Sequence, residues 1–156
     1  MSSALQQEPR QRRPFESPGH EAIVGLLRTA DLVRRQAAAL IEPHGITLQQ
    51  FNVLRILRGA GDAGLPTLEV AERMIEQTPG VTRLLDRLET KELVRRQRCP
   101  RDRRQHLCWI TAKGLALLEK LDAVTSRAHE ESLKGLRQKE RVAFIRLLDA
   151  IRAAHQ

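Results

Sequence analysis

Apolar residues recur at every third or fourth position along most of the chain, a spacing typical of amphipathic helices. Six segments have this pattern: residues 18–41, 48–57, 68–75, 78–91, 112–133 and 138–154. Several segments begin at residues that favour a helix start, namely Ser17-Pro18, Thr47, Thr67, Thr78-Pro79 and Thr111. The sequence therefore predicts a mainly α protein, with two short helices in the middle of the chain.

The periodicity changes after Lys91. Residues 93–98 and 106–110 favour two short strands, and the polar stretch between them favours a turn, so we expect a β-hairpin. The expected register pairs Val94 with Ile110. Because a single hairpin cannot form a core by itself, it must pack against the neighbouring helices.

The composition adds a bias toward polyanionic partners. The 156 residues include 27 Lys and Arg against 19 Asp and Glu, a formal net charge of +8. Nucleic acid or an acidic membrane surface would suit this charge, but a coding bias toward arginine would produce it as well. No apolar run is long enough for a membrane span and the N-terminus lacks the pattern of a secretory signal, so we expect a cytoplasmic protein.

The positive charge is concentrated in the predicted hairpin. Residues 95–104 contain six arginines and one aspartate, a formal +5. In a solvated hairpin this repulsion would only cost stability, whereas a hairpin on nucleic acid would set it against phosphates. The two short helices before it, over about 68–75 and 78–91, have helix-turn-helix spacing. Together they favour a protein that binds double-stranded DNA through a helix and a cationic wing.

The start of the second short helix is the expected recognition surface, since its apolar residues would be buried on the opposite side. The candidate DNA contacts here are Gln77, Thr78, Pro79, Gly80, Thr82, Arg83 and Arg87. Those on the wing are Arg96, Arg98, Arg101, Asp102, Arg103 and Arg104. An ordinary solvated helix face is the competing interpretation of the first set.

The chain resembles the MarR family of winged-helix transcriptional regulators in three stretches: ITLQQFNVLRIL, LPTLEVAERM and TPGVTRLLDRLETKELVRRQRCPRDRRQHLCWITAKG. They cover about residues 46–114, and the long flanking helices suit the family too. The resemblance implies that the major groove is entered by Thr78, Pro79, Gly80, Thr82 and Arg83. It also implies that the wing tip enters the minor groove through Arg104, which Asp102 orients and Arg101 and Arg103 flank.

One position departs from the family pattern. Where the family has Gly after the recognition helix, this chain has Glu92. If the backbone is left-handed there, a residue other than Gly costs about 1 kcal/mol. The angle at which the wing leaves the helix therefore depends on the backbone conformation at Glu92.

The terminal helices are candidates for dimerisation. We expect a flexible basic arm over 1–16 and one domain over 17–156, with the winged helix at about 46–111 and dimerisation helices at about 18–42 and 112–154. These apolar residues of the last two helices are expected to need partners: Leu115, Leu118, Leu121, Val124, Leu136, Phe144, Ile145, Leu148 and Ile151. A homodimer would meet that need and place two recognition helices on a pseudo-palindromic operator, although packing within one monomer is the alternative.

Regulation by a small molecule is a further implication of the resemblance. The family commonly releases DNA when an aromatic or phenolic effector binds between the dimer helices and the winged domain. His44 and Arg55 are candidate polar lining residues, although a lone His near a helix end is more often structural. Redox control through Cys99 is an alternative, because cationic neighbours lower the pKa of a thiol. The expected register places Cys99 and Cys108 opposite other residues, which argues against a disulfide.

The candidate chemistry points away from catalysis. The histidines lack metal-ligand spacings and no catalytic dyad is recognisable, so we expect neither a cofactor nor an enzyme. A repressor relieved by an effector is the favoured interpretation. Its rivals are a nonspecific architectural DNA-binding protein and a small enzyme with an anionic substrate.

Overall fold

The computed structural model describes residues 15–76, 79–99, 102 and 105–155, in two compact units formed by residues 1–39 and 40–156. Most of the expected N-terminal arm lies outside the described residues. The same holds for five candidate DNA contacts, which are Gln77, Thr78, Arg101, Arg103 and Arg104. Their roles stay predictions.

A long helix, α1 (Pro18–Ile41), makes up most of the described part of the first unit. It starts as predicted, with the Ser17 hydroxyl accepting a hydrogen bond from the His20 N–H at 3.1 Å. It gives way to the short turn η1 (Glu42–His44), which Gly45 closes with a φ of 80°. α1 exposes four large apolar side chains: Ile23, Leu27, Leu32 and Val33.

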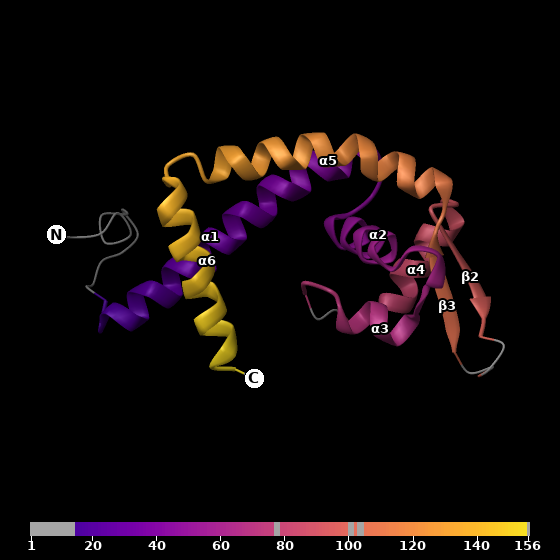
Figure 1. Cartoon of the computed structure of the whole chain (residues 1–156), viewed down its shortest axis with the longest axis horizontal. Coiled ribbons are helices and arrows are strands. Elements are labelled where there is room, and N and C mark those ends of the chain that lie inside the picture. Colours follow the sequence, from indigo (N-terminus) through magenta and orange to yellow (C-terminus); the bar gives the residue numbers. More distant parts are fainter. Residues whose placement is uncertain (1–14, 77–78, 100–101, 103–104, 156) are drawn as a thin grey trace. The chain divides into compact units, whose positions relative to one another are not determined.

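The second unit contains the remaining elements. In chain order they are α2 (Leu48–Ala60), η2 (Gly61–Ala63), β1 (Leu65–Pro66), α3 (Thr67–Glu72), α4 (Val81–Thr90), β2 (Val94–Arg98), β3 (His106–Ile110), α5 (Ala112–Ser132) and α6 (Gln138–Ala153). Figure 1 shows α2 at the centre, with α4, β3 and α5 around it. Thr47 and Thr111 cap α2 and α5 as predicted, by accepting from the backbone N–H groups of Gln50 and Gly114.

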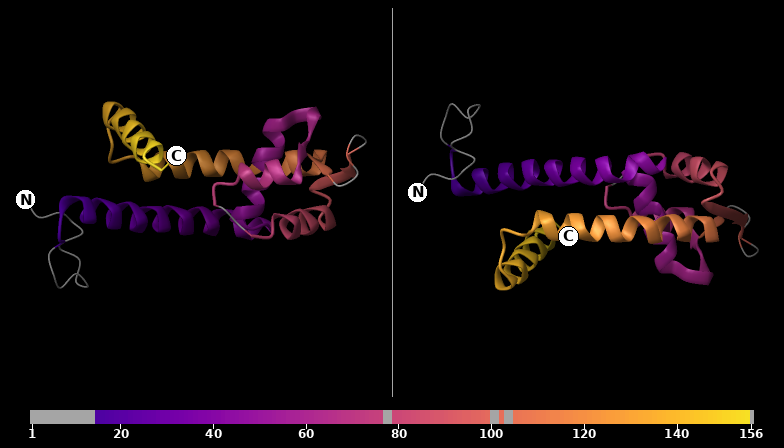
Figure 2. Two further views of the ribbon diagram at one scale, coloured as in Figure 1. Left: turned by 90° about the horizontal axis from the view of Figure 1, so that it is seen from below. Right: turned by 90° about the horizontal axis from the view of Figure 1, so that it is seen from above.

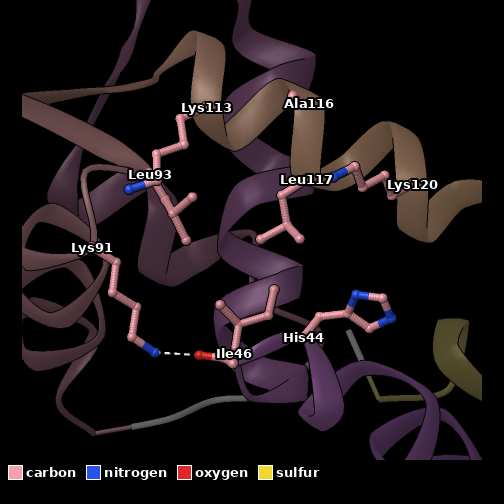
Figure 3. A pocket seen from close by; sticks show the side chains of 9 residues that line it. His44, Ile46, Lys91, Leu93, Lys113, Ala116, Leu117 and Lys120 are labelled. Carbon is pink, nitrogen blue, oxygen red and sulfur yellow. Dashed lines mark hydrogen bonds between the residues drawn. The ribbon is translucent and has the colours of Figure 1, made fainter.

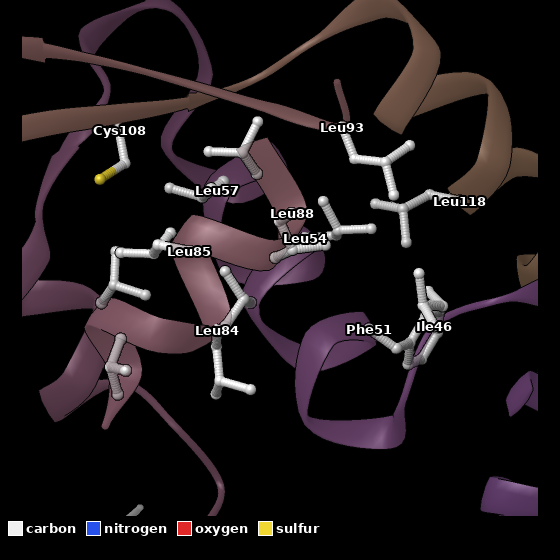
Figure 4. Packing of buried hydrophobic residues seen from close by; sticks show 14 of the residues in the cluster. Ile46, Phe51, Leu54, Leu57, Leu84, Leu85, Leu88, Leu93, Cys108 and Leu118 are labelled. Carbon is white, nitrogen blue, oxygen red and sulfur yellow. The ribbon is translucent and has the colours of Figure 1, made fainter. Parts of the chain in front are cut away.

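One apolar cluster holds the second unit together (Figure 4). Leu54 of α2 and Leu88 of α4 are fully buried in it. The expectation that Leu118 and Leu121 await a partner subunit is wrong, because the first half of α5 packs on α2 and both side chains are 0% exposed. Burying one such side chain contributes about 1.5–3 kcal/mol. The start of α5 therefore belongs to the core of the winged helix.

A three-stranded antiparallel sheet, ordered β1-β3-β2, borders this core. Its hairpin has the predicted register, with Val94 opposite Ile110 and Arg96 opposite Cys108. The sequence predicts only these two strands. The third strand, β1, has two residues of which one is proline, so it shows no alternation by which it could be recognised.

Thr67 links α3 to this sheet. It is the first residue of the helix rather than its cap, contrary to the prediction. Its hydroxyl instead donates to the carbonyl of His106 at 3.4 Å and lies 3.7 Å from the sulfur of Cys108. Burial raises the pKa of the Cys108 thiol, and the contact with Thr67 offsets only part of this effect. Both cysteines are free, as expected from the register.

The two helices of the helix-turn-helix are shorter than predicted. α3 ends at Glu72 instead of near Ile75, and α4 begins at Val81, three residues later than expected. Gly80 has a φ of 102°, a left-handed conformation that an α-helix cannot contain. Pro79 and Gly80 therefore belong to the turn before the helix.

α5 runs from the wing to α6, which leaves its far end at a steep angle (Figure 1, Figure 2). Arg141 fastens this corner by donating to the carbonyls of Leu133 and Leu136 at 3.1 Å and by pairing with Glu130 at 2.6 Å. All residues of α6 are described, and none of them is buried. Its exposed apolar side chains are Val142, Phe144, Ile145, Leu147 and Ile151. Among the described helices, none combines the length and apolar character that a bilayer span needs.

Gly64 brings the loop before β1 close to the wing. Its φ is 67°, and a Cβ atom at this position would lie 2.5 Å from the ring of Trp109. The Trp109 ring is held in place because its indole N–H donates to the carbonyl of Asp62 at 3.0 Å. A side chain at residue 64 would therefore strain the backbone and displace the indole.

Replacing Gly64 by Ala is expected to lower the free energy of unfolding by about 2–3 kcal/mol, since backbone strain and overpacking act together. Gly59→Ala is the matched control, because Gly59 lies in α2 with nothing within 4 Å of its Cβ position. The control is expected to raise stability by about 0.5 kcal/mol. Urea denaturation followed by circular dichroism measures both, and equal effects would contradict the packing of Gly64 on Trp109.

Candidate nucleic-acid interface

α4 has one face in the core and one face in solvent. Its buried side chains are Val81, Leu84, Leu85 and Leu88. Its exposed side chains include Thr82, Arg83 and Arg87, which we call the DNA face. Neither arginine makes an ion pair with any residue that the structure describes. Both guanidinium groups are thus available to a partner, on a helix that the core holds from behind.

The turn before α4 suits a close approach by a phosphate. Pro79 and Gly80 are exposed, and the Gly80 carbonyl accepts hydrogen bonds from the N–H groups of Arg83 and Leu84 at 2.9 and 3.2 Å. The first N–H groups of a helix have no acceptor within the helix, and the helix dipole adds positive potential there. A phosphate oxygen could accept from the N–H groups at the very start of α4, and Gly80 has no side chain that would block its approach.

The arginines of the wing differ in their surroundings. Arg95 lies over the ring of Trp109, with its guanidinium carbon 4.2 Å from the ring centroid. Arg98 is exposed at the end of β2 and has no ion-pair partner among the described residues. Arg96 points to the opposite side of the strand from Arg95 and is only 18% exposed.

Arg96 ties the wing to α4. Its guanidinium donates to Glu89 through Nε at 2.9 Å and Nη2 at 2.6 Å, and Nη2 also lies 2.5 Å from an Asp86 oxygen. The Arg96 backbone N–H donates to the same Glu89 carboxylate at 3.2 Å. Burial by itself would lower the pKa of Arg96, but the hydrogen bonds with Glu89 and Asp86 outweigh it and raise the pKa. The sequence predicts Arg96 as a DNA contact, whereas in the structure its guanidinium lies between two carboxylates of α4.

α4 ends in a Schellman motif that has Glu92 where Gly is usual. The N–H of Leu93 donates to the Leu88 carbonyl at 2.9 Å, and the N–H of Glu92 donates to the Glu89 carbonyl at 2.8 Å. Glu92 has a φ of 60°, the one positive φ of a residue other than Gly in the described chain. The left-handed backbone considered from the sequence is therefore present, at a cost of about 1 kcal/mol.

Contacts with the start of α5 offset this strain. The Thr111 hydroxyl donates to the Glu92 carbonyl at 2.7 Å, and Lys113 pairs with the Glu92 carboxylate at 2.9 Å. The hydrogen bond from Lys113 holds the pKa of Glu92 below its usual value. Recognition helix, wing and α5 therefore meet at one turn, formed by Lys91, Glu92 and Leu93.

The tip of the wing is described only in part. The Asp102 carbonyl accepts from the Gln105 N–H at 3.0 Å, and the Cys99 N–H donates to the Gln105 carbonyl at 2.8 Å. Because Arg104 lies outside the described residues, its pairing with Asp102 stays a prediction. Cys99 is half-buried, and its oxidation as a control of DNA binding also stays a hypothesis.

The two candidate effector residues lie apart. His44 lies in η1 and lines a pocket with three lysines, Lys91, Lys113 and Lys120 (Figure 3). Arg55 is exposed on α2, with its guanidinium 5.8 Å from the centroid of Phe51, and does not line this pocket. Sequence reasoning misses these lysines because only the fold brings Lys91 and the η1 turn to the start of α5, where Lys113 and Lys120 lie. Among the described residues, no cluster of His, Cys, Asp and Glu is arranged to hold a metal ion.

Arg96 and Arg98 make a matched pair for testing the wing. Arg96→Ala is expected to lower the free energy of unfolding by about 2 kcal/mol, because Glu89 and Asp86 lose a charged partner in a partly desolvated place. Arg98→Ala is expected to change it by less than about 0.5 kcal/mol. Chemical denaturation at fixed salt measures both, and similar values for the two variants would show that the Arg96 network does not hold the wing.

Comparison with known proteins gives a consistent result. The sequence profile of the MarR family matches residues 46–106. The transcriptional regulator MhqR of Bacillus subtilis is 31% identical over 100 residues, which are 64% of this chain and 68% of that protein. A MarR transcription factor of Planctomyces limnophilus is 35% identical, with a TM-score of 0.68 over 88% of this chain and 99% of the other.

A third similar structure is BpsR of Bordetella bronchiseptica, whose DNA binding is regulated by 6-hydroxynicotinic acid. It is 28% identical, with a TM-score of 0.74 over 89% of this chain and 95% of that one. These matches agree with the helix-turn-helix, the wing and the long terminal helices described above. The chain belongs to the MarR family of winged-helix transcription regulators.

Proposed function

We propose that the chain binds a pseudo-palindromic DNA site as a homodimer and represses transcription until a small effector releases it. The observation that supports DNA binding most is the DNA face of α4, formed by Thr82, Arg83 and Arg87. It is exposed, its arginines have no ion-pair partner in the described chain, and the opposite face is buried. A helix held in this way fits the major groove of B-DNA with its polar side toward the bases.

The helix and the wing make different kinds of contact with DNA. Arg83, in the first turn of α4, reaches a guanine edge, where a guanidinium can form two hydrogen bonds to O6 and N7. Arg98 and the wing-tip residues Arg101, Arg103 and Arg104 supply contacts to phosphates and to the minor groove, which attract cations whatever the base sequence. Base preference thus comes from α4, and salt-dependent affinity comes from the wing.

The exposed apolar side chains of the terminal helices support a homodimer. α6 has no buried residue, and α1 exposes four large apolar side chains. Apolar faces of this extent on a monomer are typical of a surface that a partner covers. A twofold dimer would place two copies of the DNA face one helical turn apart, about 34–36 Å.

Control by an effector is supported by a relative whose DNA binding a small molecule regulates. In BpsR, DNA binding is regulated by 6-hydroxynicotinic acid, a small aromatic acid. We infer that this chain responds to a small aromatic or phenolic molecule as well. Such a molecule can lower DNA affinity only by binding the DNA-free conformation more tightly than the bound one.

Selection of bound duplexes from a random pool tests the proposal. A regulator is expected to enrich one pseudo-palindromic sequence and to bind it roughly 10³-fold or more tightly than random duplex at the same salt. Enrichment of no sequence would contradict the proposal and favour the architectural alternative. If the chain bound no duplex from the pool, both the proposal and the architectural alternative would be contradicted.

On the selected duplex, Arg83→Ala is expected to change which base is preferred at one position of each half-site, whereas Arg104→Ala is expected to weaken binding to all sequences. Removing one phosphate contact should reduce the slope of log Kd against log salt by about one unit. Fluorescence anisotropy at several salt concentrations measures both effects. Lys139→Ala, an exposed cation at the start of α6, is the control and should change neither quantity. An unchanged slope in Arg104→Ala would contradict the role of the wing tip.

For the dimer, Ile145→Glu is expected to shift the protein to monomers, because it places a charge in the exposed apolar face of α6. Lys139→Glu introduces the same group on the polar side of the same helix and should leave the dimer intact. Sedimentation equilibrium measures the association constants, and an unchanged dimer in Ile145→Glu would exclude α6 from the interface.

A further inference from the structure

The exposed side of α4 carries one carboxylate beside its arginines. Asp86 follows Arg83 by three residues and precedes Arg87 by one, and all three side chains are exposed. With about 100° of rotation per residue, Asp86 lies roughly 150° from the centre of the stripe of buried leucines and valine. Asp86 therefore points away from the core, on the side of the helix that would face a duplex.

The charge of Asp86 is balanced by the wing. Nη2 of Arg96 lies 2.5 Å from Oδ1 of Asp86, yet the Asp86 side chain is still 53% exposed. Its second oxygen, Oδ2, has no hydrogen-bond partner among the described residues. A carboxylate alone on a DNA-binding surface would be repelled by phosphates, whereas this one is paired with a cation and keeps one oxygen open to a donor.

We propose that Asp86 reads a base, by accepting a hydrogen bond from the N4 amino group of a cytosine in each half-site. This inference rests on the proposed function, in which α4 enters the major groove. An ionised carboxylate can only accept hydrogen bonds. In the major groove, guanine and thymine present acceptors, adenine presents a donor beside the acceptor N7, and cytosine presents its amino donor alone. Asp86 therefore favours cytosine and disfavours the other three bases.

The spacing from Arg83 indicates where this cytosine lies. Three helical residues span about 4.5 Å along the helix axis, which is close to one base-pair step of about 3.4 Å. Arg83 donates to guanine acceptors in the proposed function, and Asp86 accepts from a cytosine donor. We expect the cytosine in the base pair that Arg83 contacts or in the adjacent one.

Two substitutions of Asp86 test the base contact, by selection from the random pool and by fluorescence anisotropy on the selected duplexes. Asp86→Asn is expected to change the preferred base from cytosine to adenine, since an amide can accept from N6 and donate to N7. Asp86→Ala should reduce the preference for cytosine at this position about tenfold. An unchanged preference in both variants would overturn the proposal.

Glu89→Gln is the matched control for a structural effect. Glu89 binds the same guanidinium of Arg96, and it also accepts from the Arg96 backbone N–H. This control may weaken the tie between helix and wing, so any loss of affinity should be equal on every duplex and the base preference should stay the same. If Glu89→Gln alters the preference as Asp86→Asn does, Asp86 acts only through the wing and the proposal is wrong.

A modified duplex tests the same contact with the unmodified chain. N4-methylcytosine at the selected position replaces the amino hydrogen that faces the major groove, and it should weaken binding about tenfold. Asp86→Ala should bind the methylated and ordinary duplexes equally. Equal binding of both duplexes by the unmodified chain would overturn the proposal, and this arm stays decisive if circular dichroism shows that Asp86→Ala is unfolded.

The outcomes separate this inference from the proposed function. Tighter binding of Asp86→Ala to every duplex would show that the carboxylate only repels DNA, and would overturn the inference. An enriched pseudo-palindrome whose base preferences do not depend on Asp86 would also overturn it, while leaving the proposed function standing. Enrichment of no sequence by the unmodified chain would refute both.

Discussion

The guanidinium group of Arg96 joins the recognition helix to the wing. It belongs to β2 but makes its hydrogen bonds with Glu89 and Asp86 of α4, in a place where its side chain is 18% exposed. Changing the angle between helix and strand would break several charge-assisted hydrogen bonds at once. In a DNA-binding protein this rigidity favours binding, because a helix and a wing that are already positioned lose less conformational entropy.

A second joint connects this pair to α5. The turn at Glu92 is held by Thr111 and Lys113, and the close packing of Gly114 reinforces it, since a Cβ there would lie 2.4 Å from the Leu93 carbonyl. α5 continues from this joint to the α6 corner. Through this turn the position of α4 is tied to that of α5.

The sequence predicts features that depend on neighbouring residues and misses those that depend on distant ones. The helices, the Thr47 and Thr111 caps and the hairpin register follow from local periodicity and capping chemistry. β1 is missed because two residues have no period, and the start of α4 is misplaced because the φ of Gly80 overrides the Thr-Pro start signal. The partners of Arg96, the burial of Leu118 and the lysine pocket arise from residues that only the fold brings together.

Hydroxyl-radical footprinting on the selected duplex locates the helix and the wing on the same molecule of DNA. We expect two protected half-sites whose centres are about one helical turn, or 10–10.5 base pairs, apart. We also expect flanking protection in the minor groove from each wing. A single protected half-site, protection spread evenly along the duplex, or half-sites without flanking minor-groove protection would contradict binding by a dimeric winged helix.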